Sequence, residues 1–174
     1  VMLGHYENKM KKSPFLQQVN QDNLAEYVET KVIEELPLSE ARPETKAVIS
    51  CDSLVMEVLY QGSGIARYPV NLGRIEGTTP KGEFIVAEKW LRPYWKKNGG
   101  YRLPGQLNHK IGSRLVILYD EEEGRKLESC IHKWPYHLIP FRQGRNSRGC
   151  IRMRPRDMDE FFDIIDLGSR FIIR

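Results

Sequence analysis

The sequence predicts a mostly β domain with a few helices, preceded by a helical N-terminal arm. Apolar residues alternate with their neighbours along residues 54–60, which is the period of a half-buried strand. Turn-forming residues 61–64 then lead into a second strand candidate, residues 65–72, so the two segments predict a hairpin. Near the N-terminus the apolar spacing is four residues instead of two, which favours a helix.

The N-terminal arm and its linker cover residues 1–46. A leucine or valine recurs at every fourth position from Leu24 to Leu36, and this spacing predicts a helix over residues 20–36. Pro37 ends that helix, because proline cannot continue a helical hydrogen-bond ladder. The prolines and charges that follow are typical of a linker. The folded domain is therefore expected to span residues 47–174.

Further regular structure is expected inside the domain. The stretch 90–111 is rich in Tyr, Trp, Lys and Gly and predicts a long loop or lid. Asp157 with Glu160 three residues later forms a capping-box pattern, which predicts a helix that Gly168 closes. Additional strands are predicted at Phe84–Trp90, Arg114–Tyr119, Leu127–His132 and Arg170–Ile173.

The composition of the chain limits which kinds of partner it can bind. The chain has 174 residues, 40% hydrophobic and 29% charged, which is ordinary for a globular protein, and we expect a monomer. It contains no apolar run of about 18 residues, so no membrane span is predicted. The net charge of +4 owes much to an arginine cluster near the C-terminus, and such a cluster suits an acidic partner. No nucleic-acid motif accompanies it, so a carboxylate-bearing partner is preferred over nucleic acid. The cluster comprises Arg142, Arg145, Arg148, Arg152, Arg154 and Arg156.

The three cysteines have different expected roles. Because their number is odd, at least one thiol stays unpaired even in an oxidising compartment. Cys51 and Cys130 flank apolar strand residues, so they are expected to be small buried residues, either reduced or bridged to each other. That leaves Cys150 as the candidate reactive thiol.

Cys150 and His132, 18 positions apart, could form a cysteine nucleophile with its base. A nearby imidazole lowers the pKa of a thiol, and the thiolate is the reactive species. Gly149 allows the backbone to approach a substrate closely, and its N–H and that of Cys150 could stabilise an oxyanion. The alternative is a buried structural cysteine in a Ser-Arg-Gly turn.

The segment from Ala47 to Arg174 resembles the catalytic domain of L,D-transpeptidases, the YkuD-like family of cysteine enzymes that cross-link peptidoglycan. Three blocks carry the resemblance. The first two are Tyr-Pro-Val-Asn-Leu-Gly at residues 68–73 and Thr-Pro-Lys-Gly-Glu-Phe at residues 79–84. In the third, His132 precedes Ser-Arg-Gly-Cys-Ile at residues 147–151, where Arg148 replaces the histidine of the family pattern.

The resemblance implies a mixed β-sandwich and a two-step acyl transfer without a cofactor. The cysteine attacks the third residue of a tetrapeptide stem, D-Ala leaves, and an amine of another stem resolves the thioester. His132 is implied to be the base, oriented by the backbone carbonyl of Lys133. Five residues are candidates for contact with the peptide stem: Arg152, Arg148, Ser147, Tyr136 and Trp134.

Three alternatives remain open at this stage. Water as the acceptor would make the protein an L,D-carboxypeptidase that trims tetrapeptides to tripeptides. A catalytically silent wall-binding module is the alternative from another class. A zinc site built from His132, Cys130, Cys150 and His109 matches no structural zinc spacing, and no metal is expected. The family implies a periplasmic or cell-envelope location, and the chain, which opens on Val1 without a signal peptide, is expected to be a mature or trimmed form.

Overall fold

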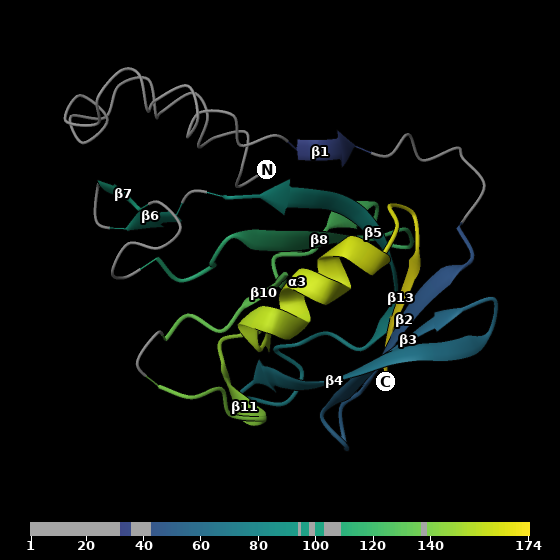
Figure 1. Cartoon of the computed structure of the whole chain (residues 1–174), viewed down its shortest axis with the longest axis horizontal. Coiled ribbons are helices and arrows are strands. Elements are labelled where there is room, and N and C mark those ends of the chain that lie inside the picture. The colour runs from purple at the N-terminus through teal and green to yellow at the C-terminus, as the bar shows by residue number, and fades with distance from the viewer. Residues whose placement is uncertain (1–31, 36–42, 94, 98–99, 103–108, 137–138) are drawn as a thin grey trace.

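The computed structural model describes residues 32–35, 43–93, 95–97, 100–102, 109–136 and 139–174 (Figure 1). Its first strands are β1 (Val32–Glu35), β2 (Thr45–Ser50), β3 (Val55–Tyr60), β4 (Ser63–Gly73), β5 (Gly82–Leu91), β6 (Trp95–Lys97) and β7 (Gly100–Arg102). The later elements are β8 (Arg114–Asp120), β9 (Arg125–Lys126), β10 (Ile131–Lys133), β11 (Gly144–Ser147), β12 (Ile151–Met153), helix α3 (Pro155–Ile164) and β13 (Arg170–Ile173).

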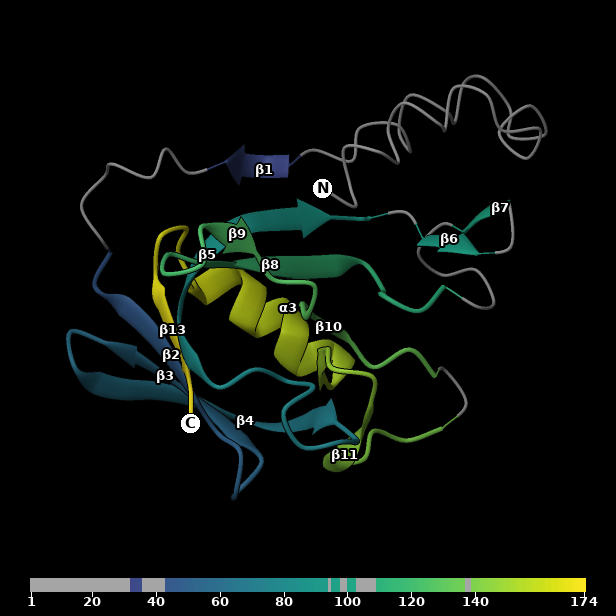
Figure 2. The ribbon, with the colours of Figure 1, turned by 180° about the vertical axis from the view of Figure 1, so that it is seen from behind.

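The main sheet closes on itself. Its strands follow the order β5-β13-β2-β3-β4-β12-β10-β8, and β8 pairs again with β5, which lies beside it in both views (Figures 1 and 2). Closure depends on the length of β5, which pairs with β13 through residues 82–85 and with β8 through residues 85–91. A register irregularity between Val86 and Glu88 lies where the strand changes partners. The mostly β class is confirmed, but the main sheet of the described residues is closed, and the sandwich arrangement is not confirmed.

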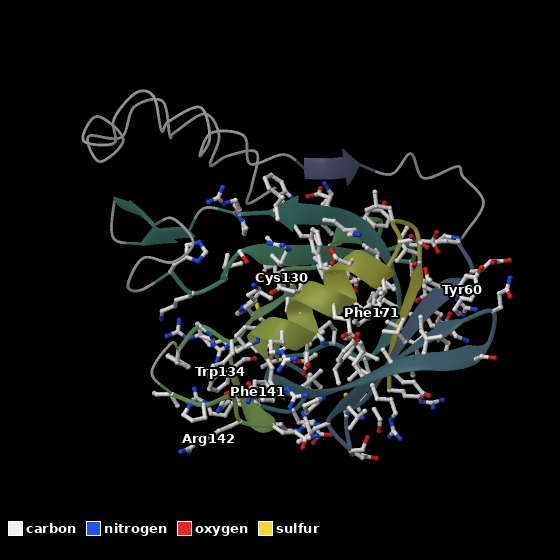
Figure 3. All side chains as sticks on the ribbon, viewed as in Figure 1. Tyr60, Cys130, Trp134, Phe141, Arg142 and Phe171 are labelled. Atoms are coloured by element: carbon white, nitrogen blue, oxygen red, sulfur yellow. The ribbon has the colours of Figure 1, made fainter. Side chains whose placement is uncertain are left out.

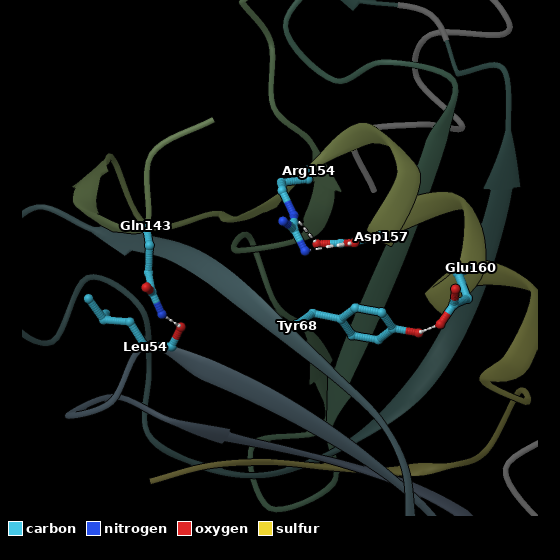
Figure 4. A network of polar contacts seen from close by, with 6 residues as sticks. All are labelled: Leu54, Tyr68, Gln143, Arg154, Asp157 and Glu160. Carbon is cyan, nitrogen blue, oxygen red and sulfur yellow. Dashed lines mark hydrogen bonds and ion pairs between the residues drawn. The ribbon is translucent and has the colours of Figure 1, made fainter. Parts of the chain in front are cut away.

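Helix α3 packs against the sheet and contributes Met158, Phe161 and Phe162 to the core (Figure 1). Its buried Phe161 lies edge-on to Tyr68 and Phe171, with ring centroids 6.4 and 6.3 Å apart. The hydroxyl of Tyr68 donates a hydrogen bond of 2.7 Å to Glu160 on the same helix (Figure 4). Burying a phenylalanine contributes about 1.5–3 kcal/mol to folding, so these rings fix α3 more strongly than the single hydrogen bond does.

The start of α3 differs from the prediction. The helix begins at Pro155, and Arg154 is its N-cap residue without a side-chain capping bond. Proline favours the first helical position, where its missing N–H has no intrahelical partner to lose. Asp157, predicted as the cap, lies in the first turn and accepts a hydrogen bond of 2.6 Å from Nε of Arg154 (Figure 4). The helix ends at Ile164, before Gly168.

Most strand predictions are confirmed. Strands β3, β4, β5, β8 and β13 match the segments predicted from apolar patterns. Gln61 and Gly62 have φ of 49° and 80°, the left-handed conformation of a tight hairpin turn. The prediction for Leu127–His132 was wrong for most of its length, because only Ile131–Lys133 forms a strand there. The side chain of Ser129 in that segment instead donates to the carbonyl of Thr78 at 3.2 Å.

The predicted arm helix lies mostly outside the described residues. Its last part is corrected, because Val32–Glu35 forms β1, which pairs antiparallel with β5. Valine and isoleucine favour strands, and β5 offers an open edge beyond its pairing with β13. Part of the predicted loop 90–111 forms the small β6–β7 hairpin. Among the described residues, no helix is long and apolar enough to cross a lipid bilayer.

Candidate active site

Two short parallel strands bring His132 and Cys150 to the same place. In the β10–β12 pair, Ile131 lies opposite Ile151 and His132 opposite Arg152. The N–H of Ile151 donates to the carbonyl of Cys130 at 2.9 Å, which fixes the register one residue before the paired isoleucines. The predicted base therefore lies on β10 and the predicted nucleophile directly before the adjacent strand β12, although 18 positions separate them in sequence.

His132 is held by its own strand. Its side chain is buried, and Nδ1 lies 2.7 Å from the carbonyl oxygen of Lys133. A carbonyl can only accept, so Nδ1 carries a proton and the other ring nitrogen is left for a different partner. Lys133 is itself anchored, because its ammonium group lies 2.7 Å from Asp159 on α3 and its N–H donates to Ile111.

The electrostatic environment favours the thiolate of Cys150. A hydrogen bond from the Cys130 thiol, and a hydrogen bond and charge attraction from His132, lower the pKa of Cys150 to about 4, although burial opposes the shift. This shift favours the thiolate, which is the form in which a cysteine acts as a nucleophile. The pKa of Cys130 is raised well above its ordinary value by the same contact and by burial.

Hydrogen bonds fix the loop that presents Cys150. The hydroxyl of Ser147 accepts from the N–H of Gly149 at 3.0 Å and donates to the carbonyl of Cys150 at 2.6 Å. Thr79 donates to the carbonyl of Gly149 at 2.8 Å. Gly149 has φ of 139°, and a Cβ there would lie 2.6 Å from the carbonyl oxygen of Thr78, so only glycine fits.

The expected oxyanion role of the Gly149 amide is corrected by this geometry. That N–H is already bonded to Ser147, so it is not available to a substrate oxygen. Ser147 is 2% exposed, which makes it a loop anchor and keeps it from direct contact with a substrate. Gly149 thus contributes through backbone conformation and close packing.

Arg152 lies between aromatic rings beside the strand pair. Its guanidinium carbon is 5.9 Å from the ring centres of both Trp134 and Tyr136, and its Nε is buried without a hydrogen-bond partner among the described residues. Trp134 is buried and packs edge-on against Phe141, which Figure 3 places beside it, whereas Tyr136 is exposed. The arrangement leaves a buried donor group without an acceptor at a partly open position.

The arginine cluster does not form one surface. Arg148 is exposed, and Arg142 lies at the outer edge of the molecule near β11 (Figure 3). Arg145 donates to the carbonyl of Cys51 at 3.1 Å, and Arg154 pairs with Asp157. Only Arg152 combines a position beside the strand pair with an unsatisfied donor, so it is the member of the cluster best placed to contact a bound anion.

Two further residues at the site were not assigned a role there from sequence. The sequence predicts a turn at Thr79 and a packing role for Cys130. Cys130 does pack beside Ile111 and Leu115, but its sulfur also lies 3.6 Å from that of Cys150. One signal for this contact was present, since both cysteines begin the pattern Cys-Ile followed by a basic residue. All three thiols are free, and Cys51 is buried in the main core, so no Cys51–Cys130 bridge is present.

The alternative zinc site is not assembled. His109 is engaged elsewhere, with Nε2 2.7 Å from the carbonyl of Pro93 and Nδ1 accepting from Gly112. Within the described part of the chain, no three His, Cys, Asp or Glu side chains are grouped to hold a metal ion.

Residues 45–173 match the L,D-transpeptidase catalytic domain (YkuD), and the chain belongs to this family. A comparison with curated protein sequences gave no match.

Several solved L,D-transpeptidases have a similar fold. A Mycobacterium smegmatis enzyme is 17% identical with a TM-score of 0.56, the match covering 75% of this chain and 58% of that one. A Mycobacterium tuberculosis enzyme is 19% identical with a TM-score of 0.57, covering 76% and 58%. A cysteine-to-serine mutant of the Enterococcus faecium enzyme is 18% identical with a TM-score of 0.57, covering 76% and 50%. This chain therefore spans little more than half of those proteins.

Proposed function

We propose that this domain is a cysteine acyltransferase that acts on peptidoglycan stem peptides in the cell envelope. The observation that carries the proposal is the arrangement of Cys150, His132 and the carbonyl of Lys133 at neighbouring strands, in a chain that belongs to the L,D-transpeptidase family. The lowered pKa of Cys150 supports the same role, because it supplies a thiolate without a separate activation step.

In the proposed first step, the thiolate of Cys150 attacks the carbonyl carbon of the third, L-configured residue of a tetrapeptide stem. The carbon–nitrogen bond to D-Ala then breaks, and the departing amine takes a proton from His132. The Nδ1–H bond to Lys133 keeps the imidazole oriented for this transfer. The N–H of Cys150 is the remaining backbone candidate for stabilising the oxyanion, because the Gly149 amide is occupied.

In the proposed second step, an amine of another stem attacks the thioester while His132 accepts its proton. The thiolate leaves, and a cross-link between two third residues forms. Arg152 is proposed to bind a free carboxylate of a stem, because its partly unsatisfied guanidinium is the charged donor beside the nucleophile. Trp134 and Tyr136 would wall that subsite, while Arg148 lies exposed where it could contact the acceptor strand.

Mass spectrometry of muropeptides tests the proposal. Purified protein incubated with disaccharide tetrapeptides is expected to release D-Ala and produce cross-linked dimers. Cys150→Ala should produce none, while Cys51→Ala, at a buried cysteine away from the strand pair, should retain activity. Tripeptides without dimers would replace the proposal with an L,D-carboxypeptidase. Unchanged tetrapeptides, with a thiol that still reacts with iodoacetamide, would indicate a silent wall-binding module.

A further inference from the structure

Cys130 contacts the proposed nucleophile, and the reaction outlined above gives it no part. The two sulfur atoms lie 3.6 Å apart, within the range of a sulfur hydrogen bond. Cys130, labelled in Figure 3, directly precedes β10 of the strand pair that carries the site. A second thiol at this distance from a thiolate is a chemical partner as well as a packing residue.

Backbone pairing between β10 and β12 brings the two thiols into contact. Cys130 and Cys150 each precede a paired isoleucine of the parallel β10–β12 ladder, so they occupy equivalent positions just before the two adjacent strands. Equivalent residues of neighbouring strands direct their side chains to the same face, about 4.8 Å apart. The hydrogen bond between the N–H of Ile151 and the carbonyl of Cys130 fixes this register. The two sulfurs therefore stay together without any long side chain having to be ordered.

The surroundings of the two thiols decide which one keeps its proton. The pKa of Cys130 is raised by its hydrogen bond with Cys150 and by burial, because Cys130 packs against the apolar cluster of Trp90, Ile111 and Leu115, where a charge is costly. Cys150 faces the imidazole of His132, and its pKa is lowered. The groups that shift the pKa of Cys150 are Cys130 and His132, both from the β10 segment. The apolar surroundings of Cys130 favour it as the S–H donor and Cys150 as the acceptor.

A donor that keeps its proton complements His132 in the catalytic cycle. His132 gives a proton to the departing amine and takes one from the attacking amine, so the charge that it presents to the sulfur changes from step to step. The Cys130 thiol has no proton transfer to perform and stays available. When the thioester is resolved, it can donate to the departing thiolate, whose burial otherwise makes the charged form unfavourable.

We propose that Cys130 is a positioning residue whose S–H group donates a hydrogen bond to the thiolate of Cys150 and holds that sulfur in place beside His132. The inference rests on the proposed function in that Cys150 is taken as the nucleophile. Its immediate consequence concerns thiol reactivity, which can be measured without any peptidoglycan substrate.

The test is the pH dependence of Cys150 alkylation by iodoacetamide, followed by peptide mapping, in the wild type, Cys130→Ala, Cys130→Ser and the control Cys51→Ala. All samples are kept reduced, since adjacent thiols are readily oxidised to a disulfide. In Cys130→Ala the pH at which Cys150 becomes reactive should rise, with the rate at pH 5 about two- to fifteenfold lower and the rate at pH 9 little changed. Cys130→Ser retains an O–H donor and should restore most of the wild-type profile.

Two results would overturn the role of Cys130. One is an unshifted profile in Cys130→Ala. The other is an equal loss at every pH in both variants, which would indicate a packing defect that thermal unfolding would also reveal. A shifted profile together with no reaction on muropeptides would overturn the proposed function and leave this inference standing.

Discussion

The strand pair that carries the candidate site and the core beneath α3 are held by different forces. Under α3, Phe161 and Phe171 are fixed by apolar burial, which is strong and non-directional. At β10 and β12, the loop before Cys150 is fixed by directional bonds from Ser147 and Thr79. Apolar burial under α3 stabilises the fold, whereas directional hydrogen bonds position the atoms of the candidate site. Changes in the two regions should therefore have separable effects.

The largest expected effect is on covalent trapping at the site. The family implies that a carbapenem acylates the nucleophile, so intact-mass measurement should show one adduct on the wild type. Cys150→Ala should show none and keep its unfolding transition, because the core beneath α3 is untouched. Cys51→Ala should still form the adduct, since Cys51 lies in the core. An adduct that survives in Cys150→Ala would contradict the assignment of the nucleophile.

Phe161→Ala should lower the stability of the fold and leave the reactivity of Cys150 close to that of the wild type. Removing this fully buried ring leaves a cavity between Tyr68 and Phe171, and the expected loss is about 3–5 kcal/mol in the free energy of unfolding. Urea denaturation measures it. At low denaturant the folded fraction should still be alkylated at Cys150 at a rate close to the wild type. A large fall in that rate would show that the core also tunes the site.

Arg152→Lys should affect substrate use more than stability. Lysine keeps the charge but loses the planar fork beside Trp134 and Tyr136. A charge-assisted bidentate contact to a stem carboxylate is worth about 1.5–3 kcal/mol, so kcat/KM should fall by on the order of tenfold or more. Arg156→Lys, at an exposed position on α3, is the matched control and should change little. If both are silent while Cys150 stays reactive, carboxylate recognition lies elsewhere.

Tyr68→Phe should give the smallest effect. It removes the hydrogen bond to Glu160 and leaves the ring packed against Phe161, so the expected loss is about 1 kcal/mol in the free energy of unfolding. Chemical denaturation measures this loss, and the carbapenem adduct should form as before. A loss as large as that of Phe161→Ala would mean that hydrogen bonding fixes α3 as strongly as burial does.

Sequence predicted the elements whose cause is local. Alternating apolar residues located β3 and β4, and the turn at Gln61 and Gly62 followed from its residue types. Closure of the sheet depends on β5 meeting β8 across a change of register, which no local pattern encodes. Pro155 rather than Asp157 set the start of α3, because backbone preference at the first helical position prevailed over the capping pattern.

At the candidate site, too, sequence predicted the features with a local cause and missed those that depend on distant residues. Cys150 and His132 were identified from residue chemistry and motif, and the structure places them at adjacent strands. The engagement of the Gly149 amide and the contact of Cys130 could not be predicted, because both depend on how a loop and a strand register place atoms from distant parts of the chain. Sequence thus identified the candidate reactive groups, and folding determined which neighbours they have.

The parallel ladder between β10 and β12 has a consequence for how such a site can diversify. The separation of base and nucleophile is set by backbone pairing at Ile131 and Ile151, and the chain that connects the two strands does not set it. That connection is fastened separately, with Gln143 donating to the carbonyl of Leu54 (Figure 4) and β11 pairing with β4. A graft that replaced residues 135–142 with a segment of another length could therefore alter which molecules are admitted while leaving the reacting atoms where they are. The connecting segment can then vary while the pairing of the two parallel strands stays fixed.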